Sequence, residues 1–246
     1  MSEVVKNSLK AIIPSPVKSL VWDLIQSLRE FRWRFIGNQQ MACGAGPSAF
    51  FIGVMSPVER YRAESFLEKE PETLEWIRKC LQPGDVFLDI GANVGIYSLF
   101  AAKVQPKAQV LAFEPESQNY ARLCLNIHRN GFENILPFPL AFSDQTKPSS
   151  FFVSDLTPGS SFHNVGQPSS FSTQGTKKIP FIQGTYCITL DQWFGRNSSP
   201  FPSLIKLDVD GLEENILAGG MGVLSDPRLR SILVEVSDAP GEPSKI

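Results

Sequence analysis

The stretch from Asp89 to Gly95 combines residue types that suit a small charged ligand. It follows the apolar run Val86–Ile90 and has the sequence Asp-Ile-Gly-Ala-Asn-Val-Gly. Gly91 allows the backbone to turn sharply, and Gly95 allows a following helix to begin close to a ligand. Free N–H groups at a helix start can receive a carboxylate, and the Asp89 carboxylate could hold an ammonium group, directly or through water. S-adenosylmethionine (SAM) carries both charges at its methionine end. The alternative is a glycine turn of any doubly wound domain.

Glu114 supplies a second feature, because it follows the next apolar run, Gln109–Phe113, 19 residues after Gly95. An acid at that place accepts hydrogen bonds from both ribose hydroxyls of an adenosine. The competing ligand, NAD, is bound by the pattern G-x-G-x-x-G, whereas the spacing here is G-x-x-x-G. The chain also has no Walker lysine at this turn, so the pattern favours SAM over NAD and ATP. A solvated loop carboxylate is the alternative for Glu114.

A third acidic feature is Asp208, which ends a predicted strand within Ile205–Glu213. Ligands of open parallel sheets lie at the carboxyl ends of strands. Asp208 could therefore face a sulfonium or act as a general base toward an acceptor hydroxyl. Asp210 and Glu213 follow Asp208 in the turn. They could belong to the same acidic site or, alternatively, cap the next helix. Because no histidine is nearby, we predict no metal site.

A regular alternation of predicted strands and helices determines where these residues lie in the fold. Helical and strand patterns succeed one another, with Ser117 as a predicted N-cap and Gly131 as a helix stop. Pro137 and Pro139 favour an edge position for the third strand. Such alternation predicts a parallel, doubly wound α/β sheet. The predicted elements are strands Val86–Ile90, Gln109–Phe113, Ile135–Leu140, Ser203–Asp208 and Ser231–Val236, and helices Gly95–Val104, Ser117–Asn130 and Glu213–Ala218.

Segments outside this alternation have their own patterns. Residues 143–185, rich in Ser, Gly, Thr and Pro, predict loop and short antiparallel strands over the carboxyl edge of the sheet, as a lid or substrate loop. His163, within this segment, could reach the site. A short strand is predicted at Ala49–Val54, and helices within residues 57–80. Val17–Phe35 has helical periodicity, which fits a packed helix or, alternatively, a membrane-surface or partner-binding helix.

Composition narrows the classes of function. The chain has 246 residues, 42% of them hydrophobic, and a net charge of −2, which is not that of a nucleic-acid polycation. Its four cysteines are scattered without a CxxC pair, which speaks against a zinc site and a disulfide framework. No apolar run approaches the roughly 20 residues of a membrane span. With no signal-peptide pattern near the N-terminus, we expect a cytoplasmic protein.

Together these motifs resemble the FkbM family of SAM-dependent methyltransferases. The similarity lies in "LQPGDVFLDIGANVGIYSLFAA", "VLAFEPESQNYARLCLNIHRN", "ITLDQWF", "SLIKLDVDGLEENILAGG" and "ILVEVS", and it covers about residues 70 to 238. Asp210 stands where glutamate is commoner in that family. The resemblance implies methyl transfer from SAM to a hydroxyl of a sugar or other natural-product scaffold. It also implies a site role for Asp208 and cofactor-binding roles for Asp89, Gly91, Asn93, Gly95 and Glu114.

The resemblance implies a class I methyltransferase fold, with a Rossmann-like doubly wound sheet. Its C-terminal strand pair has no counterpart before Ile246, so we expect a C-terminally incomplete domain. We therefore predict an N-terminal helical extension over residues 1–48 and a SAM-binding methyltransferase domain over residues 49–246.

The leading hypothesis is a SAM-dependent O-methyltransferase with a small-molecule or glycan acceptor. The predicted chemistry is SN2 methyl transfer, driven mostly by positioning, with Asp208 assisting proton removal. One alternative is a non-catalytic SAM-binding fragment or pseudoenzyme. Another is a nicotinamide-dependent oxidoreductase, which the glycine spacing disfavours.

Overall fold

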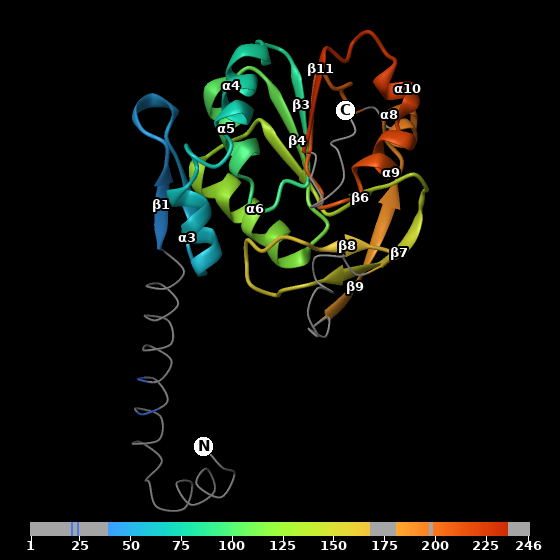
Figure 1. Cartoon of the computed structure of the whole chain (residues 1–246). Coiled ribbons are helices and arrows are strands. Elements are labelled where there is room, and N and C mark those ends of the chain that lie inside the picture. The colour runs from blue at the N-terminus through green and yellow to red at the C-terminus, as the bar shows by residue number, and fades with distance from the viewer. Residues whose placement is uncertain (1–20, 22–23, 25–38, 168–180, 197–198, 236–246) are drawn as a thin grey trace, which may run out of the picture. The chain divides into compact units, whose positions relative to one another are not determined.

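A computed structural model describes residues 21, 24, 39–167, 181–196 and 199–235 (Figure 1). A compact unit begins at Gln40, and all elements named below belong to it. Of the predicted helix Val17–Phe35 only Val21 and Leu24 are described, and both are helical; the remainder lies outside the described residues. Residues 236–246, which bear on the expected missing strand pair, lie outside them as well.

The central element is a parallel five-stranded sheet in the order β11-β10-β3-β4-β5. The order reverses between β3 and β10, which makes this junction the switch point where doubly wound sheets bind ligands. The structure thus confirms the predicted doubly wound sheet and the edge position of the proline-containing strand. The strands are β3 (Val86–Ile90), β4 (Gln109–Phe113), β5 (Ile135–Phe138), β10 (Leu204–Leu207) and β11 (Ser231–Val234).

Helices cover both faces of this sheet because the side chains of its strands alternate between two apolar cores. Phe87, Val110 and Ala112 pack in one core with α4, α5 and α6. Leu88 and Leu111 pack in the other with α8, α9 and α10. Among the described residues, no helix is long and apolar enough to cross a bilayer. The helices are α4 (Pro71–Cys80), α5 (Ile96–Val104), α6 (Ser117–Asn130), α8 (Leu190–Arg196), α9 (Glu213–Ala218) and α10 (Met221–Leu224).

An N-terminal hairpin packs against α6. Its strands are β1 (Gln40–Cys43) and β2 (Phe50–Gly53), joined through the 3-10 turn η1 (Gly46–Ser48). Only the second strand was predicted, and the predicted domain start at residue 49 falls inside this hairpin. Side chains of α6 accept hydrogen bonds from backbone N–H groups of β2. The Gly53 N–H, for example, donates to Asn126 Oδ1 at 2.8 Å.

Helix α3 (Pro57–Glu64) follows the hairpin and begins with a capping box. The Glu59 N–H donates to Ser56 Oγ at 3.0 Å, and the Ser56 N–H donates to Glu59 Oε2 at 3.1 Å. The other oxygen of Glu59 accepts from Arg122 of α6 at 2.5 Å, and both side chains are buried. A paired buried charge of this kind fixes α3 onto α6, because separating the ions would leave each one uncompensated.

A second, smaller sheet follows β5, and Figure 1 shows it beyond one end of the main sheet. Its strands are β6 (Ala141–Phe142), β7 (Lys147–Val153), β8 (Asn164–Val165) and β9 (Phe181–Ile188), in the order β6-β9-β7-β8. The β7–β8 and β7–β9 pairs are antiparallel, as predicted, whereas β6 and β9 run parallel. Residues 168–180 of the predicted insertion lie outside the described residues.

The predicted cap of α6 is wrong. The N-cap is Glu116, whose two carboxylate oxygens accept from the N–H groups of Gln118 at 3.1 Å and Asn119 at 2.7 Å. Its longer side chain can reach both amides, so Ser117 becomes the first helical residue instead. The predicted stop at Gly131 is confirmed by its left-handed φ of 66°.

Candidate functional site

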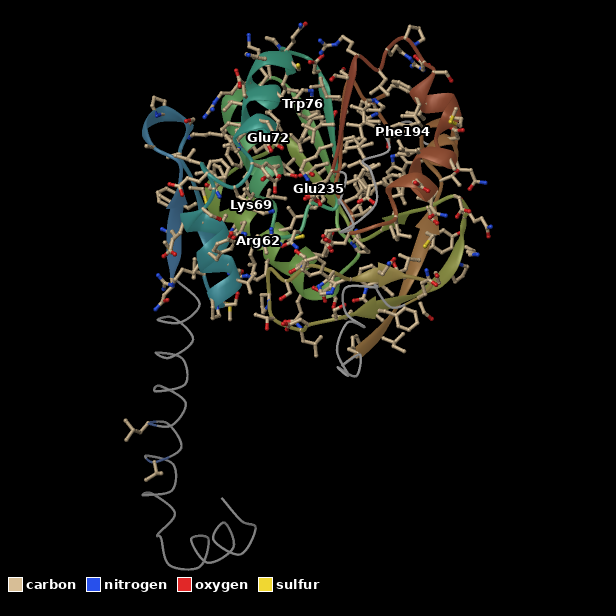
Figure 2. The ribbon with its side chains drawn as sticks, in the orientation of Figure 1. Arg62, Lys69, Glu72, Trp76, Phe194 and Glu235 are labelled. Carbon is tan, nitrogen blue, oxygen red and sulfur yellow. The ribbon has the colours of Figure 1, made fainter. Side chains whose placement is uncertain are left out.

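A cavity of about 920 Å³ opens at the carboxyl ends of β3, β4 and β10, beside the switch point. Its volume lies in the upper part of the range of about 300–1,000 Å³ for small-molecule sites. Helix α3, the segment before α4 and strands β7 and β8 contribute the other walls. Figure 2 shows Arg62 and Lys69 on the α3–α4 side of this region and Glu235 at the end of β11. The structure brings Gly91, Asn93, Glu114 and Asp208 together around this cavity; Asp89 and Gly95 do not line it.

Gly91 makes the turn after β3 possible in two ways. Its φ is 82°, and a Cβ at this position would lie 1.8 Å from the carbonyl oxygen of Asp208. The turn therefore lies directly against the end of β10, where only glycine fits. The Gly91 and Ala92 amides both donate to the carbonyl of Phe113, at 3.0 and 2.9 Å, which fixes the turn to the end of β4.

The backbone and surroundings of Gly95 also require a residue without a side chain. Its φ is 94°, and a Cβ there would lie 2.5 Å from a methyl of Leu123 on α6, so the glycine also allows close packing of α5 on α6. Its amide donates to the Ala92 carbonyl at 2.8 Å. Among the described residues, the N–H groups of Ile96 and Tyr97, the first two of α5, have no acceptor, and both residues line the cavity. These two amides can receive a carboxylate.

Glu114 is held in the cavity wall by backbone amides. Its side chain accepts from the Asn93 N–H at 2.7 Å and from the Glu116 N–H at 2.8 Å, and the residue is only 5% exposed. Burial raises the pKa of this carboxyl to about 8 despite the two amide bonds, which favour the charged form. A ligand with two hydroxyl donors would add hydrogen bonds to the ionised carboxylate and so stabilise that form.

Asp89 lies behind the wall. It is fully buried, accepts from Ser98 Oγ at 2.5 Å and lies 4.0 Å from Lys206 Nζ. Burial raises its pKa, and the Lys206 ammonium partly opposes this. The structure therefore places Asp89 where it acts on Lys206, and not where it would touch a ligand in the cavity directly.

Asp208 lines the cavity and is paired with a lysine of its own strand. Lys206, 1% exposed, places its ammonium 2.8 Å from Asp208 Oδ2 and 4.8 Å from the centroid of the Tyr97 ring. Burial alone would raise the pKa of Asp208, but Lys206 and a hydrogen bond from Glu235 hold it well below the ordinary range. An acid this strong stays ionised, so it is a weak proton acceptor.

The match to a known family follows this geometry. The model of the methyltransferase FkbM domain matches residues 89–245, which hold the turn, Glu114, Asp208 and Glu235. The chain belongs to the FkbM methyltransferase family. It is thus a SAM-dependent methyltransferase with a class I, Rossmann-like fold, and the family match speaks against the nicotinamide-dependent alternative.

Named relatives are similar at moderate identity. The 31-O-demethyl-FK506 methyltransferase FkbM of Streptomyces tacrolimicus is 29% identical over 180 residues, 65% of this chain and 68% of that protein. The hexuronic acid methyltransferase AglP of Haloferax volcanii is 27% identical over 201 residues, 82% of this chain and 75% of that protein. Among solved structures, the precorrin-6y C5,15-methyltransferase of Geobacter metallireducens matches with a TM-score of 0.38 and 19% identity, covering 68% of this chain and 61% of that one.

A strap over residues 157–163 contributes Ser160, Ser161, Phe162 and His163 to the wall of the cavity of this FkbM methyltransferase. The side-chain amides of Asn93 and Asn119 both donate to the Ser160 carbonyl, at 2.9 and 3.1 Å. The Gly159 N–H donates to Asn119 Oδ1 at 2.8 Å, and Arg62 Nε donates to the Gly159 carbonyl at 2.7 Å. The strap is therefore held by α3, by α6 and by the turn after β3.

Asp210 and His163 join the cavity at the end of this strap. The Phe162 N–H donates to Asp210 Oδ2 at 2.6 Å, and burial raises the pKa of Asp210 to about 6. His163 lines the cavity, as its place in the insertion allowed, and its Nδ1 accepts from the Ser154 N–H at 3.1 Å. Burial lowers the pKa of His163, which favours the neutral ring.

Sequence reasoning missed four residues of the site: Arg62, Asn119, Lys206 and Glu235. Arg62 and Asn119 act through contacts with a strap far away in sequence, which no local pattern reports. Lys206 carried a signal, since a lysine within an apolar strand needs a buried partner. Glu235 also carried a signal, because it is an acid next to the last residue of the predicted parallel strand Ser231–Val236, near the edge at which Glu114 and Asp208 lie. Among the described residues, no group of three or more His, Cys, Asp or Glu side chains has the arrangement of a metal site.

Proposed function

We propose that this FkbM methyltransferase transfers the methyl group of SAM to a hydroxyl oxygen of a sugar or natural-product acceptor. The observation that carries the proposal is the convergence of the Gly91 turn, Glu114 and Asp208 on one cavity at the switch point of the sheet. The relatives support an oxygen acceptor, since one is named for O-demethyl-FK506 and another for a hexuronic acid.

The residues present fit SAM. Glu114 offers a buried carboxylate to the two ribose hydroxyls, and the N–H groups of Ile96 and Tyr97 offer donors to the methionine carboxylate. The Asp208 carboxylate, which stays ionised, complements a positive charge at the end of β10. When bound, SAM supplies a methyl group activated by its sulfonium.

The protein contributes mainly position and electrostatics to this reaction. The two glycine-dependent packing contacts fix the turn, and the strap bonded by Asn93 and Asn119 forms part of the cavity wall. A site fixed in this way can align an acceptor oxygen with the methyl carbon without reorganisation, which is the larger part of catalysis in such transfers.

Calorimetry with SAM tests the binding part. The unaltered chain should bind SAM, and Glu114→Ala should weaken binding about 10–100-fold, the loss of a hydrogen bond to a charged group worth about 1.5–3 kcal/mol. Glu133→Ala, an exposed carboxylate away from the cavity, should bind as the unaltered chain does. Failure of the unaltered chain to bind SAM would refute the proposal.

Transfer is tested with SAM labelled in its methyl group and a panel of methyl glycosides, methyl hexuronates and polyol macrolides. The expected product carries the label as an alkali-stable methyl ether. SAM binding without transfer to any member would favour the pseudoenzyme alternative. Labelling of nitrogen or carbon would contradict the assignment to oxygen.

A further inference from the structure

Two carboxyl groups lie close to one buried ammonium beneath the cavity, and a third carboxyl adjoins one of them. Lys206 Nζ lies 2.8 Å from Asp208 Oδ2 and 4.0 Å from Asp89 Oδ1. The third carboxyl, Glu235, hydrogen-bonds Asp208. One cation can balance one carboxylate, so an additional negative charge in this cluster is costly unless it takes up a proton.

The backbone of the two neighbouring strands brings Asp208 and Glu235 together. Strands β10 and β11 pair in parallel with Leu207 opposite Val234, and the Glu235 N–H donates to the Leu207 carbonyl at 2.9 Å. Each acid therefore follows directly on the last residue of its strand, at the same edge of the sheet. Since two carboxylates only accept, their hydrogen bond contains one shared proton.

The two acids differ in what else they touch. One oxygen of Asp208 is committed to Lys206, and the Asp208 side chain is 23% exposed. Glu235, labelled in Figure 2, has no lysine partner of this kind within the described residues. It is exposed and lines the cavity. The shared proton can therefore exchange with a molecule in the cavity through Glu235.

We propose that Glu235 is the catalytic base that removes the hydroxyl proton of the acceptor, with Asp208 and Lys206 as its positioning residues. This assignment rests on the proposed function. The acceptor O–H bond breaks and its proton goes to the Glu235 carboxylate, while the oxygen forms its bond to the methyl carbon. The electron pair of the carbon–sulfur bond that breaks stays on sulfur. The assignment replaces Asp208 as the predicted base, because the lysine keeps Asp208 too acidic for that task.

The pair must lose its shared proton before Glu235 can accept another. The hydrogen bond to Asp208, helped by the partial loss of solvent around the carboxyl, raises the pKa of Glu235 to about 8. Glu70 raises it further and Lys69 lowers it, both from the segment before α4, where they form a 2.5 Å ion pair with each other. On the other side of the pair, the Lys206 ammonium lowers the pKa of Asp208, while the charges of Asp89 and Asp208 repel each other. Below about pH 8 the proton occupies the pair, and above it Glu235 is free, so the rate of transfer should rise with pH through this range.

Glu235→Gln tests the assignment, since an amide keeps the hydrogen bond to Asp208 but cannot accept the proton. We expect kcat to fall about 10²–10⁴-fold, the SAM dissociation constant to change less than twofold, and the rise of rate with pH to disappear. Glu235→Asp should regain part of the rate. The matched control is Glu72→Gln, an exposed carboxylate on α4 that does not line the cavity and should behave as the unaltered chain (Figure 2). A Glu235→Gln variant with normal kcat and a normal pH profile would overturn the proposal.

A second measurement needs no acceptor. In the ligand-free protein, ¹³C NMR of carboxyl-labelled glutamate identifies Glu235 as the signal missing from Glu235→Gln. This signal should titrate near pH 8, and in Asp208→Asn it should titrate at lower pH because the shared proton has lost its second acid. Titration near the ordinary value of 4.5 in the unaltered chain would overturn the pair, whatever the activity. If the unaltered chain bound SAM but methylated no acceptor, the proposed function would fail and the base role with it. Full activity in Glu235→Gln would overturn the base role alone.

Discussion

Replacing Gly91 with alanine separates the two demands that the turn after β3 makes on its glycine. The backbone at Gly91 is left-handed, with φ of 82°, and the new methyl would lie 1.8 Å from the Asp208 carbonyl oxygen. Gly84 offers a matched control, since its φ is 87° and a Cβ there meets nothing within 4 Å. Gly84→Ala therefore carries the conformational cost alone, and Gly91→Ala carries that cost plus the clash.

The magnitudes follow from these two contacts. A left-handed conformation costs a non-glycine residue about 1–2 kcal/mol, which is the expected loss for Gly84→Ala. The clash at Gly91 is with backbone that cannot rotate away, so the ends of β3 and β10 must part. Overpacking of this kind adds about 1–3 kcal/mol. Gly91→Ala should therefore lower the free energy of unfolding by about 2–5 kcal/mol in total.

Urea denaturation measures both variants. With an m-value of about 3 kcal/mol/M, the midpoint of Gly91→Ala should lie about 0.3–1 M below that of Gly84→Ala. Parting of the strand ends also moves Asp208, so SAM binding should weaken in Gly91→Ala and stay unchanged in Gly84→Ala. Equal midpoints and equal affinities for the two variants would refute the close approach of the turn to β10.

Three further outcomes are expected. Lys206→Met leaves the Asp208 carboxylate without its ammonium and should cost about 3–5 kcal/mol in urea denaturation; a loss below 1 kcal/mol, as expected for exposed Lys107→Met, would contradict the buried pairing. Asn119→Ala removes two hydrogen bonds to the strap, so the Gly159 amide should exchange faster in hydrogen-exchange NMR while the amides of β3 do not change. Because burial raises the pKa of Glu114 from 4.5 to about 8, the folded state holds a proton that the unfolded state has lost between these values. The unfolding free energy should therefore decline as pH rises from 5 to 8, and Glu114→Gln should flatten this decline; an unchanged slope would show that Glu114 ionises normally.

Much of the central sheet could be predicted because its signals are local. Strands β3 and β4 agree with the predicted ranges, since short apolar runs ended by glycine or an acid describe buried parallel strands. The positions of Glu114 and Asp208 followed from the same topology, which brings the carboxyl ends of parallel strands to one edge.

Other features depend on contacts between distant segments. Gly95 had the expected spacing, but Leu123 of α6 occupies the space beside it. Asp89 had the expected place at a strand end, but Ser98 and Lys206 engage it behind the wall. Strand β1 was missed because its four residues precede a glycine-rich turn that resembles a simple loop. Periodicity shows which side of an element is buried, but it does not show which residue lies opposite.

The ion pair between Glu59 and Arg122 has a consequence for how this enzyme can be divided and recombined. The family match begins at Asp89, yet Phe50, Ile52 and Leu74 belong to the same core as β3 and α6. A cut at the family boundary would uncover that core and leave a guanidinium buried without its counterion. In chimaeras between relatives, residues 40–88 and α6 should accordingly come from the same parent. Exchanging either part alone should require compensating substitutions at both residues of the ion pair.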